Sequence, residues 1–149
     1  MTGRALLIAC ALPWFVTADM FGQTSTAGDS TARDGVYSQE QASQGRTGYD
    51  AKCAGCHDGG TMGPELWGDQ FLAQWENKTV AAFFTRIQTT MPEDAPGSLT
   101  DKDVLDIVAY VLKTNGFPAG DKAIESTSAL TTMKFVPVRS RGFADPVET

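Results

Sequence analysis

The stretch AKCAGCHDGG, Ala51–Gly60, decides how the rest of the chain is interpreted. It contains Cys53, Cys56 and His57, which are two of the chain's three cysteines and its one histidine. The only imidazole therefore follows directly on a Cys-x-x-Cys pair. This concentration of thiol and imidazole side chains indicates one site that uses all three.

The composition is that of a globular protein with an acidic surface. The chain has 149 residues, of which 42% are hydrophobic and 20% charged, which suggests one domain with additional chain at its ends. The net charge is −6 and the sequence pI is about 4.6. Nucleic acid is an unsuitable partner, because phosphate binding requires a basic face. An acidic protein instead favours partners that present basic patches.

The N-terminus, residues 1–18, has the form of a secretory signal peptide. Arg4 supplies the positive charge, and residues 5–16 are apolar but too few to span a bilayer. Cleavage after Ala18 removes Cys10 and leaves no membrane span, which predicts a periplasmic or otherwise exported protein. The alternatives are an uncleaved membrane anchor and a lipoprotein, because LIAC matches a lipobox that ends at Cys10. The next residues, 19–35, are predicted to be a flexible leader.

Three kinds of site use a Cys-x-x-Cys pair, and His57 distinguishes them. A thioredoxin-like redox pair is compatible with an exported protein. A structural zinc site requires four ligands, whereas the cleaved chain offers two cysteines and one histidine. The third is covalent attachment of haem c, in which Cys53 and Cys56 form thioethers and His57 binds the iron. We favour haem because it uses every thiol and the only imidazole.

Methionine is the expected sixth ligand of the iron, because the chain has no second histidine. Met91 lies 34 residues after His57, which is enough chain for a helix and a loop to reach the other face of the ring. Two prolines stiffen the loop that follows it. The other methionines are poorer candidates. Met62 lies only five residues after His57, Met133 is a reserve in the tail, and Met20 lies in the leader.

The hydrophobic pattern predicts helices and no strands. A helix is expected over Gln39–Lys52, with Ser38 and Gln41 forming a capping box. A second helix is expected after Thr79. The clearest one begins after Thr100, carries a broad apolar face and ends at Asn115 and Gly116.

On these motifs the chain resembles the class I c-type cytochromes, which are small monohaem electron carriers. The resemblance covers residues 36–118 and rests on CAGCH, GPELWG, TMP and the terminal helix. It implies an all-α cytochrome c fold with three to five helices around one covalently attached haem. The first and last helices are then expected to cross at Gly45, Tyr49 and Tyr110. Residues 119–149 form a C-terminal tail that matches no motif with a known chemistry.

The resemblance also implies roles for two further residues. Pro64 fits the proline whose carbonyl faces the proximal imidazole. Trp75 is expected to direct its indole N–H at a haem propionate, although plain core packing would also explain it. Lys78 and Arg86 are candidates to neutralise the propionates, with a solvated surface role as the alternative.

Two axial ligands, His57 and Met91, predict one-electron transfer between Fe(II) and Fe(III) without substrate turnover. The expected partners are a redox donor and acceptor, such as a dehydrogenase, a terminal oxidase or another cytochrome. The FPAG segment, residues 117–120, and the tail resemble cytochromes associated with quinoprotein alcohol and sugar dehydrogenases. The chain is therefore alternatively a dedicated subunit of such a complex. A haem enzyme or gas sensor with a displaceable sixth ligand is the other alternative.

Overall fold

A computed structural model describes residues 32–59 and 62–136 of the chain. The predicted signal peptide 1–18, Met20, most of the predicted leader and the last part of the tail lie outside the described residues. Within the described residues the elements are helices, and no strand is formed beyond two isolated β-bridges. The structure thus confirms the all-α fold class.

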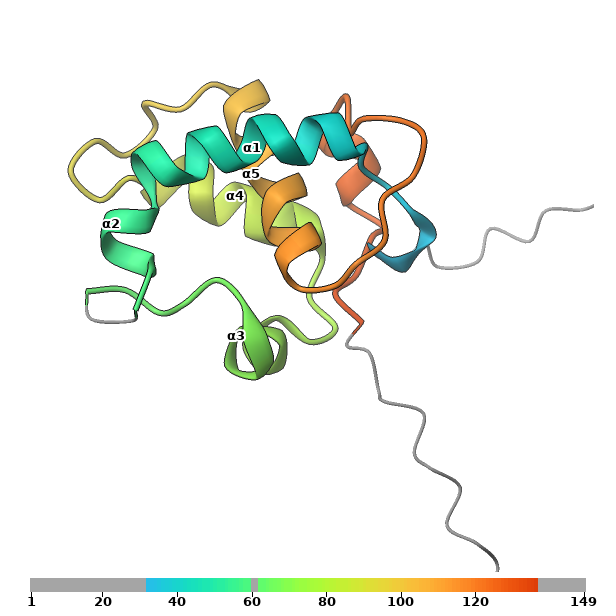
Figure 1. The fold of residues 1–149 in the computed structure, drawn as a ribbon, viewed down its shortest axis with the longest axis horizontal. Helices are drawn as coiled ribbons and strands as arrows, with labels where there is room; N and C mark the ends of the chain where they lie inside the picture. The colour runs from blue at the N-terminus through green and yellow to red at the C-terminus, as the bar shows by residue number, and fades with distance from the viewer. Residues whose placement is uncertain (1–31, 60–61, 137–149) are drawn as a thin grey trace, which may run out of the picture.

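The described residues form five α-helices and two short 3-10 helices. Their bounds in chain order are η1 Ala32–Asp34, α1 Gln39–Lys52, α2 Ala54–His57, α3 Gly68–Trp75, α4 Val80–Thr90, α5 Asp101–Thr114 and η2 Thr127–Leu130. In Figure 1, α1 lies across α4 and α5, α2 turns away from its end, and α3 lies on the far side of the molecule from α1. Within the described residues no helix is long and apolar enough to cross a membrane.

The crossing of α1 and α5 is the main helix contact of the fold. Gly45 makes it possible, because a Cβ there would lie 1.7 Å from the backbone oxygen of Asp106. The rings of Tyr49 and Tyr110 pack beside this point with centroids 5.1 Å apart. The expected crossing at these three residues is confirmed. It brings the end of α1, and the cysteines that follow, to a fixed place on the α5 scaffold.

The helix caps follow the sequence pattern with one exception. Thr100 and Asp103 form the expected capping box at the start of α5. At the start of α1 the Ser38 side chain accepts from the backbone N–H of Gln41, as expected. The Gln41 side chain does not complete a box, however. It is buried and exchanges two hydrogen bonds with the backbone of Ile124, at 3.0 and 2.7 Å.

The tail expected to begin at residue 119 is not separate from the helical body. Leu130, Met133 and Phe135 are buried in the main core. The segment also pairs with the start of the described chain, since Ala32 N–H donates to the Lys134 carbonyl at 3.2 Å. Figure 1 shows this orange-to-red segment beside the blue N-terminal one, at the end of the molecule away from α2. The expected domain boundary at residue 118 therefore cuts through a continuous core.

We expect Gly45→Ala to destabilise the protein by about 1–3 kcal/mol or more, because the backbone of Asp106 cannot yield to the new methyl group. Gly48→Ala is the matched control on the same helix. Its Cβ would meet only the Ile107 side chain at 3.4 Å, and alanine favours the helix by up to about 1 kcal/mol. Denaturant unfolding of the haem-loaded variants measures both effects. Equal stability of the two variants would contradict the close crossing.

Candidate functional site

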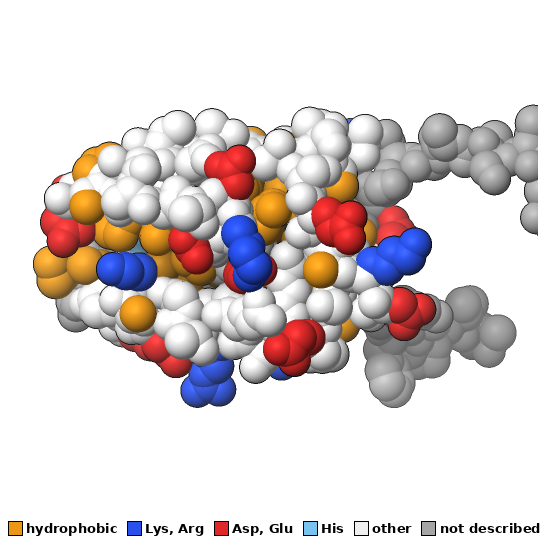
Figure 2. Space-filling view, turned by 90° about the horizontal axis from the view of Figure 1, so that it is seen from above, with side chains coloured by type: hydrophobic (Ala, Val, Ile, Leu, Met, Phe, Trp, Pro, Cys, Tyr) orange, Lys and Arg blue, Asp and Glu red, His pale blue; other side chains and the backbone are white. Residues whose placement is uncertain are grey.

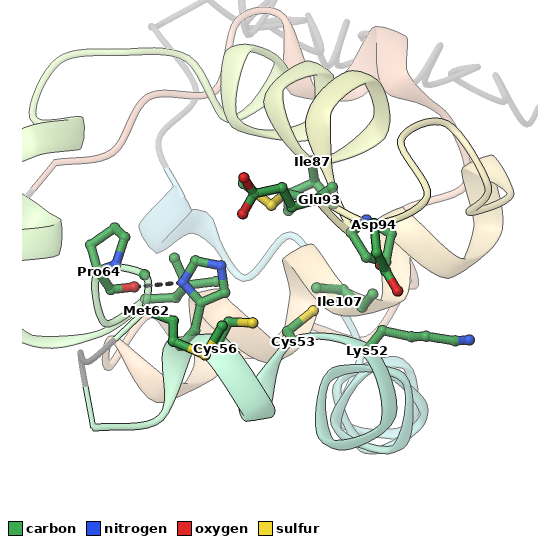
Figure 3. Close-up of a pocket in the computed structure, with 14 residues that line it drawn as sticks. Lys52, Cys53, Cys56, Met62, Pro64, Ile87, Glu93, Asp94 and Ile107 are labelled. Carbon is green, nitrogen blue, oxygen red and sulfur yellow. Dashed lines mark hydrogen bonds between the residues drawn. The ribbon is translucent and has the colours of Figure 1, made fainter.

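The predicted site residues surround two adjoining hollows. The larger has a volume of about 580 Å³ and the smaller of about 270 Å³. Both are lined by the same five residues, namely His57, Pro64, Leu66, Ile87 and Met91. Cys53 and Cys56 line the larger hollow, and Trp75 lines the smaller. All six residues predicted from the sequence thus come to one cavity system. Figure 3 shows the larger hollow, with Cys53, Cys56 and Pro64 among its labelled residues.

The junction of α1 and α2 positions the two thiols. Cys53 ends α1, where its N–H donates to the Tyr49 carbonyl at 2.8 Å, and its own carbonyl accepts from the His57 N–H at 2.9 Å. The buried Tyr49 hydroxyl donates to Asp58 Oδ1 at 2.8 Å and so links α1 to the residue that follows the motif. Cys53 is half-buried and Cys56 is exposed, and the two are not joined in a disulfide. Figure 3 shows the two side chains on the same wall of the cavity.

The environment of Cys53 does not suit a thioredoxin-like redox pair. Such pairs depend on a thiol whose pKa is depressed, because the thiolate is the reactive form. Burial, followed by the nearby Asp58 carboxylate, raises the pKa of Cys53 to about 11. The thiol is therefore protonated at neutral pH and is a poor nucleophile.

The His57 imidazole is held by the loop that follows it. The ring is buried, and its Nδ1 lies 2.6 Å from the carbonyl oxygen of Pro64, the dashed line in Figure 3. Since a carbonyl only accepts, Nδ1 carries the proton and Nε2 keeps a free lone pair. Gly63 leaves the ring its space, because a Cβ there would lie 2.8 Å from Cε1.

Met91 lies where α4 ends. It is the C-cap residue of this helix, and its N–H donates to the Ile87 carbonyl at 2.9 Å. Its half-buried side chain lines both hollows, as does His57. Met62 lines only the larger hollow and is 77% exposed. Met133 is buried in the core and lines neither hollow.

Trp75 and two cations share the smaller hollow. The half-buried Trp75 ring ends α3 and packs at 4.9 Å, between centroids, against Phe83 of α4. The Lys78 ammonium lies over the Trp75 ring, 5.2 Å from its centroid. Arg86 lines the same hollow from α4. This end of the cavity system therefore carries two positive charges, which suits an anionic group.

The mouth of the larger hollow carries charges of both signs. Lys52, Glu93 and Asp94 line it and are exposed. Figure 2 shows one face of the molecule, on which hydrophobic side chains gather in a hollow between Lys or Arg and Asp or Glu side chains.

Some residues that build the site were not identified from the sequence. Asn115, predicted only as a helix end, donates to the Leu66 carbonyl at 2.9 Å and accepts from the Gly68 N–H at 3.1 Å. It thereby fastens the loop that carries Pro64 to α5. Ile87 and Ile107 form apolar walls. The helical pattern predicts that Ile87 and Ile107 face inward, but it does not show that they line this cavity. The two bonds of Asn115 join residues distant in sequence, so no local signal predicts them.

The donor set fits haem c better than zinc. An apolar cavity is lined by two thiols, an imidazole with a free Nε2 and a thioether, which are the groups that attach and ligate a haem. Over the described residues, no three His, Cys, Asp or Glu side chains are grouped as metal ligands. A four-ligand zinc site thus has no support from the positions of these side chains.

Two comparisons with known proteins bear on this site. A family model described as "Cytochrome C oxidase, cbb3-type, subunit III" matches residues 40–111, a range that includes the thiols, His57 and Met91. Cytochrome c-555 of Prosthecochloris aestuarii is 37% identical over an alignment of 87 residues, and the match covers 50% of this chain and 88% of that protein. No solved structure matches the chain.

Proposed function

The chain belongs to the class I c-type cytochromes, and from this premise we propose that it is an exported one-electron carrier with His57 and Met91 as axial ligands of its iron. The members of this family are electron-transfer proteins. The cofactor of this chain is haem c, bound covalently through Cys53 and Cys56. When bound, the haem supplies a reversible Fe(II)/Fe(III) couple. The observation that carries the proposal is that His57 and Met91 line both hollows of the cavity.

The contacts of His57 suit a proximal ligand of the iron. Its hydrogen bond to the Pro64 carbonyl fixes the tautomer that leaves Nε2 free and makes that nitrogen more basic. The bond also holds the ring in its orientation. Gly63 has no Cβ that would push the ring out of this place. Pro64 therefore acts on the iron through the imidazole rather than by contact.

Met91 is the best placed thioether for the sixth position. A thioether ligand favours Fe(II) and raises the reduction potential. The buried Ile87 beside Met91 and the apolar walls keep water away and act in the same direction. With both axial positions filled, oxygen and peroxide have no site at the iron, which favours a carrier over a haem enzyme or gas sensor.

Trp75 and the cations beside it are proposed to face the haem propionates. Lys78 and Arg86 bring positive charge to the smaller hollow, and the Trp75 indole supplies a hydrogen-bond donor there. Propionate carboxylates buried without such partners would be costly.

The name of the matching family model indicates one class of redox partner. The family model is named for an oxidase subunit, so we propose an oxidase as the acceptor. Association with a quinoprotein dehydrogenase rests on the FPAG segment and the tail alone, and co-purification tests it. Export rests on the signal peptide predicted for residues 1–18, which lie outside the described residues.

We expect the reduced wild-type protein to keep its spectrum when exposed to carbon monoxide, because both axial positions are filled. A redox titration of the same sample should follow a one-electron Nernst curve and be fully reversible. The spectrum and the titration together separate a carrier from a sensor or enzyme. Rapid formation of a carbon monoxide complex at neutral pH would contradict the proposal.

A further inference from the structure

The segment after α5 reaches the wall of the haem cavity. Residues 131–136, here called the strap, run antiparallel to residues 77–80, the corner between α3 and α4. Val80 N–H donates to the Met133 carbonyl at 2.8 Å. Two further bonds of 3.0 Å join Phe135 to the corner, one to the Lys78 carbonyl and one from the Asn77 N–H. The strap therefore fixes the backbone of Lys78, whose side chain carries the positive charge at the smaller hollow.

Phe135 lies at the centre of an aromatic cluster. It is fully buried, and its ring lies 5.7–6.0 Å, between centroids, from each of four other aromatic rings. These are Phe71, Trp75, Phe83 and Phe117. Two of them, Trp75 and Phe83, also line the smaller hollow of the haem cavity. Phe135 thus forms a second layer directly behind this wall.

The contacts continue from Phe135 to the cationic end of the cavity. The Phe135 ring packs against the Trp75 ring, with 6.0 Å between centroids. The Lys78 ammonium lies over the same Trp75 ring, 5.2 Å from its centroid. The backbone of Lys78 is fixed by Phe135 as well. One residue of the strap therefore restrains both the ring and the backbone that determine where the Lys78 charge lies.

We propose that Phe135 is a positioning residue for the haem. Phe135 holds Trp75 and Lys78 at the propionate end of the cavity and thereby raises the reduction potential of the haem. The inference rests on the proposed function, because it requires a haem in this cavity. A positive charge held near the iron favours Fe(II), the form with less positive charge. A closed aromatic wall also excludes water, which would otherwise stabilise Fe(III). Loss of Phe135 weakens both effects, so the potential falls.

The test is the reduction potential of haem-loaded Phe135→Ala beside that of the wild type. We expect the equilibrium constant for reduction to fall by about threefold to tenfold, where tenfold corresponds to 59 mV for a one-electron couple. Leu130→Ala is the matched control. Leu130 is equally buried in the same C-terminal segment but has no ring to place against Trp75. It should lose stability and keep the wild-type potential.

A second variant covers the case in which Phe135→Ala does not fold. Phe135→Leu keeps an apolar side chain in the cluster but loses the ring contacts to Trp75 and Phe83. Its potential should also fall, by less than that of Phe135→Ala. A wild-type potential in the folded Phe135 variants, or an equal fall in Leu130→Ala, would overturn the inference. Failure of the proposed function is distinguishable, because the wild type itself would then lack covalent haem or bind carbon monoxide.

Discussion

The double variant Cys53→Ala, Cys56→Ala is expected to contain no covalently bound haem and to lack a stable fold. Without the haem, the structure retains a cavity of about 580 Å³. At about 24 cal/mol per Å³, an enclosed cavity of this size would cost on the order of 10 kcal/mol. That cost is an upper bound, because the hollow is open on one side. It is comparable to the whole stability of a small domain, about 5–15 kcal/mol.

Haem staining after a denaturing gel measures attachment, and circular dichroism melting measures the fold. The single variants Cys53→Ala and Cys56→Ala are the controls, because each retains one thioether and should keep stained protein at lower yield. Haem that stays on the double variant through denaturation would refute covalent attachment at these two cysteines. A cooperative melt of the colourless double variant would show that the helices do not depend on the haem.

We expect Met91→Ala to bind carbon monoxide when reduced and to have a much lower reduction potential than the wild type. Water or hydroxide in place of the thioether no longer favours Fe(II). Ligands and surroundings together tune haem potentials over about 0.8 V, and one ligand change should cover part of that range. Stability should also fall, because the link from the iron to the end of α4 is lost. A spectroelectrochemical titration and a carbon monoxide difference spectrum measure these changes.

Met62→Ala and Met133→Ala are the controls for this assignment. Met62 is largely exposed and Met133 lies in the core outside both hollows. Both variants should keep the closed iron of the wild type, although Met133→Ala should be less stable. If one of these variants binds carbon monoxide and Met91→Ala does not, the sixth ligand is the methionine replaced in that variant. Our assignment of Met91 would then be wrong.

Local signals in the sequence predict the parts of the fold that local physics determines. Ser38 begins α1, Thr100 and Asp103 begin α5, and Gly45 allows the two helices to cross. These residues act on their own helix or through a close contact that only glycine permits. The CAGCH motif likewise places two thiols and the imidazole at one site without reference to distant residues.

The parts that the sequence did not reveal depend on contacts between distant residues. Gln41 was expected to cap its own helix but bonds to Ile124, 83 residues away. Helix α3 was not expected, since Trp67 at its N-cap makes no side-chain capping bond. Phe135 belongs to a tail with no periodic pattern, so its place among the aromatic rings follows only from the fold. In the smaller hollow, Trp75 and Phe83 are backed by Phe135 in this way.

Proton NMR of the reduced protein, with methyl-labelled methionine, tests the proposed ligand pair most directly. A methionine bound to the iron holds its methyl group over the haem ring, where the ring current shifts the signal far upfield. The ligand pair His57 and Met91 predicts one such signal, which disappears in Met91→Leu and stays in Met62→Leu. The absence of an upfield methionine methyl, or its assignment to Met62 or Met133, would contradict the proposal.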